Sequence, residues 1–97
     1  MGYTSCSRVD LSKKAQKQLT KIPAQVVRKF ALWVDLVTME GLNAARAIPG
    51  YRDHALKGQW QGYHAVRLND AYRAIYIERD DGSLKAVHVE EVNKHDY

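Results

Sequence analysis

Three short segments carry the side chains of this sequence that could do chemistry. They are residues 54–58 (HALKG), residues 67–73 (RLNDAYR) and residues 93–97 (NKHDY). Together they supply histidine, lysine, arginine and tyrosine, which suffice for cleavage of RNA without a metal ion. In that reaction the 2′-hydroxyl attacks its own phosphate, and the products are a 2′,3′-cyclic phosphate and a 5′-hydroxyl. The residue types therefore predict an RNA-cleaving site assembled from these three segments.

Such a site needs a base, cationic donors for the phosphoryl oxygens, and an acid for the leaving oxygen. Histidine, with an ordinary pKa of about 6.5, serves either proton role near neutral pH. All four histidines lie in the second half of the chain, and their spacing does not suggest a metal site, so we expect neither metal nor cofactor. We expect His64 and His88 to be structural, and His54 and His95 to face a groove.

The first half of the chain is expected to be mainly helical. Residues 3–9 read as a first strand, and Asp10 is placed to cap a helix over residues 11–22. Pro23 suits the start of a second helix, whose apolar stripe continues to Gly41. Residues 42–48 are expected to form a short helical turn.

The second half changes to short alternating runs separated by turn residues, which predicts a run of hairpins. The expected strands cover residues 52–57, 63–68, 71–79 and 84–92. We therefore expect a small single α+β domain over residues 1–97. In it, an N-terminal strand and a two-helix hairpin pack on a mainly antiparallel sheet of four to five strands.

The loop between the expected strands 63–68 and 71–79 decides where two arginines lie. A two-residue turn pairs Leu68 with Ala71 and sends Arg67 and Arg73 to opposite faces of the sheet. A three-residue loop pairs Leu68 with Tyr72 and sets the arginines side by side. We favour the second register. Opposed like charges destabilise a sheet, so this pair makes sense if an anion lies between them.

The alternative is that each arginine forms an ion pair with an acidic residue. Glu90 and Glu91, on the last expected strand, are the candidates for that pairing. In that case the arginines would stabilise the sheet and would not bind a ligand.

The charge is unevenly distributed along the chain, which carries a net +4. The basic excess lies in residues 1–50, where Lys13 and Lys17 fall on one expected helix face that could follow a phosphate backbone. The alternative is an ordinary solvated helix face. No apolar run approaches the roughly 20 residues of a membrane span, and no secretory signal is recognised, so we expect a cytoplasmic protein without membrane contact. The single cysteine excludes an internal disulfide.

Several of these segments resemble one family of bacterial proteins. The stretch 54–58 and Gly62-Tyr63, then Arg67, residues 72–76 (YRAIY) and the final 95–97 (HDY) resemble the RelE/ParE toxin superfamily. Within it they are most similar to the HigB, YoeB and YafQ type of ribosome-dependent mRNA interferase. The similarity covers the order of elements over the whole chain and is specific from about residue 51 onward.

The resemblance implies a RelE-like fold and the toxin half of a type II toxin–antitoxin pair. Such a toxin binds the ribosomal A site, cuts mRNA there and is held inactive by a cognate antitoxin. We expect the toxin alone to be monomeric and to form a hetero-oligomer with the antitoxin.

The resemblance also suggests roles for individual residues. Arg73 matches the arginine that steadies the scissile phosphate, and Arg67 matches a second basic position beside it. His54 and Lys57 match a His-x-Leu-x-Gly motif. His95 and Tyr97 are similar to a terminal histidine-plus-aromatic group.

We accordingly assign His54 as the base and His95 as the acid, although the two roles could be exchanged. The expected phosphate ligands are Arg67, Arg73 and Lys57, and Tyr97 is expected to stack on a base or orient the substrate. Further RNA contacts are expected from Lys13, Lys17, Trp60 and Lys94. For Trp60, packing within the hairpin is an equal alternative.

The sequence departs from YoeB-like members at two points. It lacks their glutamate base before the histidine, so the base must be a histidine or Asp53. Asp96 separates His95 from Tyr97, which leaves open whether Asp96 or Tyr97 faces the site. Two other functions remain as alternatives: a ParE-like poison of DNA gyrase, which cuts no RNA, and a non-catalytic module that binds RNA or protein.

Overall fold

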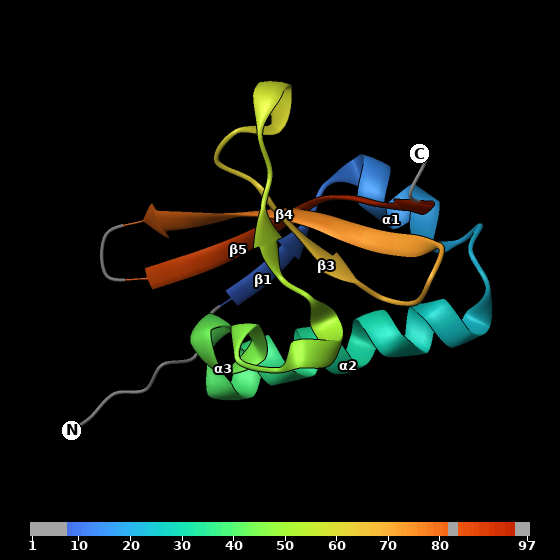
Figure 1. The fold of residues 1–97 in the computed structure, drawn as a ribbon, viewed down its shortest axis with the longest axis horizontal. Coiled ribbons are helices and arrows are strands. Elements are labelled where there is room, and N and C mark those ends of the chain that lie inside the picture. The colour runs from blue at the N-terminus through green and yellow to red at the C-terminus, as the bar shows by residue number, and fades with distance from the viewer. Residues whose placement is uncertain (1–7, 82–83, 95–97) are drawn as a thin grey trace.

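The computed structural model describes residues 8–81 and 84–94. Its helices and strands follow the order expected for an α+β domain, with a strand and helices first and hairpins afterwards (Figure 1). The elements are β1 (Arg8–Leu11), α1 (Lys13–Leu19), α2 (Ala24–Glu40), α3 (Leu42–Arg46), the 3-10 helix η1 (Pro49–Tyr51), β2 (His54–Ala55), the 3-10 helix η2 (Gly58–Trp60), β3 (His64–Arg67), β4 (Tyr72–Asp81) and β5 (Leu84–Lys94).

All five strands belong to one sheet, in the order β1-β5-β4-β3-β2. The pairs β2–β3, β3–β4 and β4–β5 are antiparallel. The pair β1–β5 is parallel. The predicted α+β class and the mainly antiparallel sheet are therefore confirmed.

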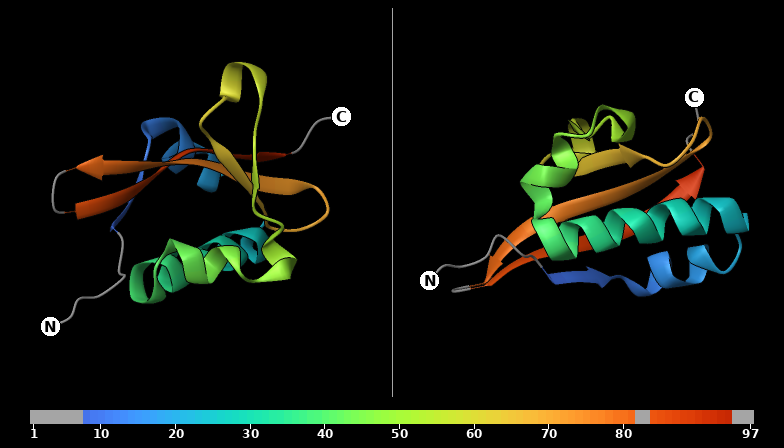
Figure 2. Two further views of the ribbon diagram at one scale, coloured as in Figure 1. Left: turned by 60° about the vertical axis from the view of Figure 1, so that its left-hand side comes forward. Right: turned by 90° about the horizontal axis from the view of Figure 1, so that it is seen from below.

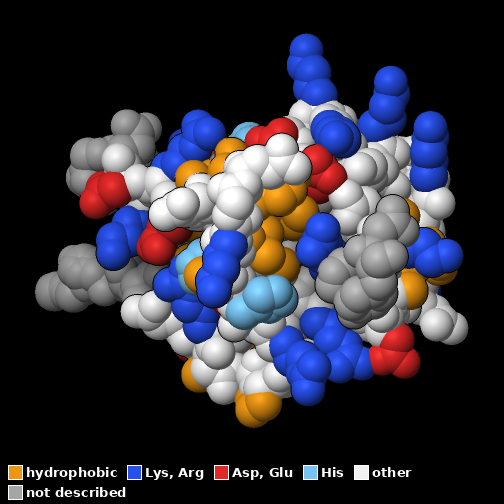
Figure 3. Space-filling view, turned by 45° about the horizontal axis from the view of Figure 1, so that its top comes forward, with side chains coloured by type: hydrophobic (Ala, Val, Ile, Leu, Met, Phe, Trp, Pro, Cys, Tyr) orange, Lys and Arg blue, Asp and Glu red, His pale blue; other side chains and the backbone are white. Residues whose placement is uncertain are grey.

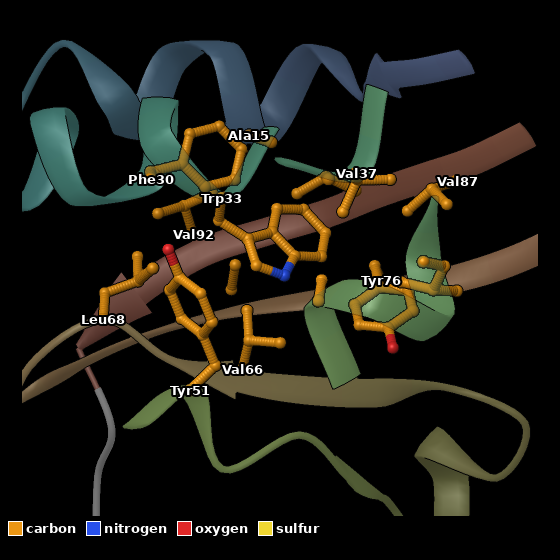
Figure 4. Close-up of a cluster of buried hydrophobic side chains, with 14 of the residues drawn as sticks. Ala15, Phe30, Trp33, Val37, Tyr51, Val66, Leu68, Tyr76, Val87 and Val92 are labelled. Carbon is orange, nitrogen blue, oxygen red and sulfur yellow. The ribbon is translucent and has the colours of Figure 1, made fainter. Parts of the chain in front are cut away.

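The hydrophobic core lies between α2 and one face of the sheet (Figure 4). Helix α2 contributes Phe30, Trp33 and Val37, which recur at the spacing of one helical face and are almost fully buried. They pack against the inward-facing side chains of β3, β4 and β5, among them Val66 and Tyr76. Burial of these large side chains from both layers holds the sheet and α2 together.

The sheet has a second face, opposite the core. Helices α2 and α3 lie on one side of the sheet, and the segment with η2 projects on the other (Figure 2). Ala65 and Ile75 are each about 1% exposed, yet they do not belong to the core cluster. Their alternation with core residues along β3 and β4 assigns them to this opposite face.

The start of α1 differs from the sequence prediction. Asp10 is not a helix cap, because it lies within β1 and pairs with His88 of β5. Ser12 is the cap instead, and its Oγ accepts a hydrogen bond from the N–H of Ala15 at 2.9 Å. The same hydroxyl donates to the carbonyl of Glu90 at 2.6 Å. Pairing with β5 therefore extends β1 past Asp10 and delays the helix.

The helices and strands of the middle of the chain also differ in length from the prediction. Helix α1 ends at Leu19, three residues early, and Pro23 is the N-cap of α2. The short helix α3 is confirmed within the predicted residues 42–48. The predicted strand 52–57 shrinks to the two residues of β2, because Arg52 adopts a left-handed conformation that a strand does not accommodate.

Within residues 8–81 and 84–94, no helix combines the length and apolar character that crossing a bilayer requires.

Candidate functional site

A groove of about 310 Å³ opens where β3 and β4 meet their connecting loop. It brings together residues from this hairpin and from the segment that enters β2. The lining residues are Arg52, His54, Ala65, Val66, Arg67, Asn69, Asp70, Tyr72 and Arg73. Three of the residues predicted to act in the site therefore share one groove: His54, Arg67 and Arg73.

The two arginines of this groove stand opposite each other. Arg67 of β3 is the register partner of Arg73 of β4. The N–H of Leu68 donates to the carbonyl of Tyr72 at 2.9 Å and closes a three-residue loop over residues 69–71. The favoured three-residue register is confirmed, and both guanidinium groups emerge on the same face of the sheet.

Asn69 shapes that loop. Its Oδ1 accepts hydrogen bonds from the N–H groups of Ala71 and Tyr72, both at 2.8 Å. This is an Asx turn, in which a side chain replaces a backbone acceptor and fixes the path of the chain. The Asx turn also fixes the backbone position of Asp70, which lies within the loop.

The two arginines differ in their partners. Arg67 forms an ion pair with the carboxylate of Asp70. Arg73 forms no ion pair with any residue that the structure describes, and its Nε is buried without a hydrogen-bond partner. An anion in the groove would compensate this charge.

The predicted alternative, in which both arginines pair with Glu90 or Glu91, is wrong. Glu91 binds Lys14, with 3.0 Å between the carboxylate and Nζ, and also accepts from the amide of Asn93. Glu90 lies 3.3 Å from Nε2 of His88. Both carboxylates are thus engaged elsewhere on the sheet.

His54 presents a free ring nitrogen. Its Nδ1 lies 2.8 Å from the carbonyl oxygen of Arg52. A carbonyl only accepts, so Nδ1 must carry the proton, and Nε2 of the neutral ring has a lone pair. His54 is exposed and stands opposite Ala65 in the register, on the same face as the arginines. The tautomer therefore suits a proton acceptor.

Arg52, whose carbonyl binds His54, has a left-handed backbone with φ of 47°. It is the one non-glycine residue of the described ranges with positive φ. Such a conformation is unfavourable for a side-chain-bearing residue and is often found at functional sites. Here it lies two residues before the histidine whose tautomer its carbonyl fixes.

Asp53 points away from the groove and is held by a separate network. Its Oδ1 accepts from Nδ1 of His64 at 2.8 Å, and its Oδ2 accepts from the hydroxyl of Tyr76. Nε of Arg46 donates to that same hydroxyl at 3.2 Å. The Asp53 side chain is only 4% exposed, so its oxygens are not available to a ligand in the groove. This geometry favours histidine over Asp53 as the base.

The network also affects titration. Burial and the hydrogen bond to Asp53 raise the pKa of Tyr76 well above its usual value. The ring of His64 stacks on that of Tyr76, with centroids 5.4 Å apart. His64 is therefore a structural member of this network.

His88 likewise binds neighbouring side chains. Its Nδ1 is 2.5 Å from a carboxylate oxygen of Asp10, across the parallel pair β1–β5. With Glu90 near its other ring nitrogen, His88 links β1 to β5. The structural prediction for both strand histidines is thus supported by their contacts.

The remaining predicted site residues lie outside the groove lining. Lys57 is exposed at the start of η2, and the Trp60 ring packs edge-on against Tyr63 with centroids 5.1 Å apart. Lys13 and Lys17 are exposed on α1. Lys94 is exposed and stands opposite Tyr72, which places the end of β5 beside the groove. His95 and Tyr97, like Asp96, lie outside the described residues.

Four polar groove residues were not predicted as site residues: Arg52, Asn69, Asp70 and Tyr72. The turn-forming Asn69-Asp70 pair was a signal for the loop, but not for its role in shaping a groove. No feature of the sequence indicated that Arg52 belongs to the site, because its left-handed backbone conformation cannot be read from the sequence.

The surface around this region carries many basic side chains. Figure 3 shows this side of the molecule, where Lys, Arg and His side chains lie around a central hydrophobic area, with several Asp and Glu side chains among them. In the groove itself, Arg52, Arg67 and Arg73 face a single carboxylate, that of Asp70. The chemistry of this lining favours an anionic ligand with apolar parts, such as a nucleotide.

No protein-family model matches the sequence, and the curated proteins give no significant match. Solved structures do match. The YoeB/ParE toxin from Agrobacterium tumefaciens is 19% identical, with a TM-score of 0.66 over 92% of this chain and 99% of that one.

Two complexes contain similar chains. One is the DinJ-YafQ toxin-antitoxin complex of E. coli, where the match is 20% identical, with a TM-score of 0.66 over 92% of each chain. The other is the YoeB-YefM complex from Staphylococcus aureus, at 18% identity and a TM-score of 0.69 over 93% of this chain and 98% of that one. The predicted fold is confirmed: this chain has the RelE-like fold that these toxin structures share.

Proposed function

We propose that this protein is the toxin of a type II toxin–antitoxin pair and acts as a metal-independent endoribonuclease on mRNA in the ribosomal A site. The observation that carries the proposal is the groove with Arg67 directly opposite Arg73 and His54 on the same face. Two cations at one point of a sheet, one of them without a counter-ion among the described residues, suit a phosphodiester.

The reaction assigns one task to each group. Nε2 of His54 accepts the proton of the 2′-hydroxyl, and the 2′-oxygen forms a bond to phosphorus. The guanidinium groups of Arg67 and Arg73 stabilise the charge that grows on the phosphoryl oxygens. The bond from phosphorus to the 5′-oxygen then breaks, and that oxygen takes a proton from the acid, for which His95 is our candidate. Each proton transfer accounts for roughly 10² to 10⁴ in rate.

Other residues extend the contact with RNA. We propose that Lys57, Lys13, Lys17 and Lys94 contact phosphates beyond the scissile one. Trp60 and Tyr97 are the candidates for stacking on bases. Arg52 joins this set because it lines the groove beside His54.

The RelE-like fold supports an antitoxin partner for this chain. One structure of that fold was solved as a toxin-antitoxin complex, that of DinJ with YafQ. We propose that a cognate antitoxin binds this chain and covers or distorts the groove, and that the free toxin is a monomer in the cytoplasm.

Primer extension on a reporter mRNA tests the proposal. A purified translation system is supplied with the wild type, Arg73→Ala or Arg79→Ala, with ribosomes present or omitted. Arg79 is a matched control, because it is exposed on the same strand but six residues away, roughly 20 Å.

The expected result is cleavage within A-site codons that needs ribosomes, is lost in Arg73→Ala and persists in Arg79→Ala. Cleavage of free RNA without ribosomes would show that the reaction does not depend on the ribosome. An intact message together with inhibited DNA gyrase would identify a ParE-like activity instead.

A further inference from the structure

The two opposed arginines of the groove are not equivalent. Arg67 is already bound to the carboxylate of Asp70, whereas Arg73 has no ion-pair partner in the part of the chain that the structure describes. Asp70 lines the same groove as both arginines. A carboxylate therefore occupies one of the two cations that a phosphate would use.

The position of Asp70 is built into the fold. The Asx turn of Asn69 fixes the loop over residues 69–71, and Asp70 stands three residues after Arg67 along it. The Asp70 side chain is 93% exposed, so no packing or further contact holds its carboxylate. An anionic ligand that binds Arg73 in the same groove could displace it from Arg67 without any unfolding of the loop.

We propose that Asp70 is an internal competitor for Arg67, which the phosphate backbone of RNA must displace on entering the groove. This inference rests on the proposed function, because the ligand that competes with Asp70 is the phosphate of RNA. The RNA phosphate gains a contact with Arg73 as well as with Arg67, so the exchange still favours binding, but the displacement of Asp70 lowers the affinity for RNA. Asp70 thus sets how tightly and how salt-dependently the groove binds RNA.

The exchange has a specific effect on salt dependence. When a free cation binds a phosphate, counter-ions are released, and single strands contribute a slope of about 0.7 per contact in a plot of log K against log salt. When phosphate merely replaces Asp70 on Arg67, the freed carboxylate gains ions of its own. The contact with Arg67 then adds almost nothing to the slope in the wild type, but adds its full share once Asp70 is neutral.

Fluorescence anisotropy with a short, labelled, 2′-O-methyl single-stranded RNA measures this directly, because that RNA binds without being cleaved. The proteins are the wild type, Asp70→Asn and the control Asp80→Asn, which removes the same charge from an exposed position on β4. Salt is varied from about 50 to 200 mM.

We expect Asp70→Asn to bind about 1.4- to fivefold more tightly than Asp80→Asn at low salt, which is the range that the energy of an exposed ion pair gives. Its salt slope should be steeper by about 0.7. In an Arg67→Ala background, both differences between the Asn variants should disappear, because there is no longer a cation for Asp70 to occupy.

The remaining outcomes overturn the proposal. Equal affinities and slopes for Asp70→Asn and Asp80→Asn would mean that the charge of Asp70 acts only at long range. A gain that persists with Arg67→Ala would assign the effect to the loop and not to competition. If the RNA binds neither the wild type nor the variants, RNA is not a ligand of the groove, and the proposed competition with Asp70 is wrong as well.

Failure of the proposed function gives a different pattern. If Asp70→Asn shows the expected gain and slope while the reporter mRNA stays intact with ribosomes, the competition stands and the nuclease activity does not. If the mRNA is cut but the Asn variants are alike, the nuclease activity stands and the competition does not.

Discussion

Arg67 and Arg73 face each other across adjacent antiparallel strands, and only Arg67 has a carboxylate partner among the residues described. Opposed like charges cost a sheet roughly 0.2 to 1 kcal/mol. Arg73→Ala should therefore not lower the free energy of unfolding, while it should reduce cleavage about 10²- to 10³-fold. Urea unfolding and primer extension on the same preparation check both. An unfolding midpoint that drops with the activity would make Arg73 a structural residue.

His54 should be needed for the chemical step and not for the fold. Its side chain is exposed and forms one hydrogen bond with the described residues, from Nδ1 to the carbonyl of Arg52. We expect His54→Ala to lower the cleavage rate roughly 10²- to 10⁴-fold and to leave RNA affinity nearly unchanged. Growth arrest that survives this substitution would point to a protein that acts by binding alone.

Asp53 should be needed for the fold and not for the chemistry. Its buried carboxylate accepts from His64 and Tyr76 and lies 3.8 Å from Nε of Arg46. Asp53→Ala leaves His64 and Tyr76 without their acceptor, while Arg46 keeps Glu78 as an ion-pair partner, so we expect the free energy of unfolding to fall by about 1 to 3 kcal/mol.

Urea unfolding followed by the fluorescence of the buried Trp33 checks the Asp53 prediction. Asp80→Ala is the control, because a substitution at an exposed position costs about 0.5 kcal/mol or less. Equal midpoints for the two variants would show that the Asp53 network does not stabilise the fold.

Tyr76 should make the protein sensitive to alkali. Its pKa is raised in the folded state by burial and by the bond to Asp53, so the folded protein keeps a proton that the unfolded chain loses. The stabilisation is complete below the ordinary tyrosine pKa of about 10 and decreases as pH rises above it. The free energy of unfolding should then fall by about 1.4 kcal/mol per pH unit for this group.

Tyr76→Phe isolates that contribution. The variant lacks the hydroxyl, so its stability above about pH 10 should fall less steeply than that of the wild type, although Tyr51, whose pKa burial also raises, still contributes. Urea unfolding at several pH values gives the two slopes. Parallel slopes would mean that Tyr76 ionises as readily in the folded protein as in the unfolded chain.

The order of elements was predictable because each carries a local signal. The apolar stripe of α2 and the alternation in β3 to β5 depend on neighbouring residues, and the three-residue loop followed from placing Arg67 beside Arg73. The cap of α1 was missed by two residues. Asp10 and Ser12 are both good caps, and the choice between them is made by pairing with β5, which lies almost eighty residues further along.

The site was predictable in its cations but not in its contacts. Arg67, Arg73 and His54 could be selected by residue type and spacing. That Asp53 is buried while its neighbour His54 is exposed depends on Arg46 and Tyr76, which come from other elements. The left-handed Arg52 depends on how η1 meets β2, and no local pattern of residues encodes it.

The parallel pairing of β1 with β5 has a consequence for synthesis. The first described strand can take its place only after residues 86–89 have been made, so the sheet is not closed until nearly the whole described chain exists. Such distant pairing slows folding, because a long loop must be ordered before the contacts form. The groove also forms late, because Tyr72 and Arg73 pair with Lys94 and Asn93 at the end of β5. A nascent chain therefore carries both arginines before the strand that completes the groove has been made.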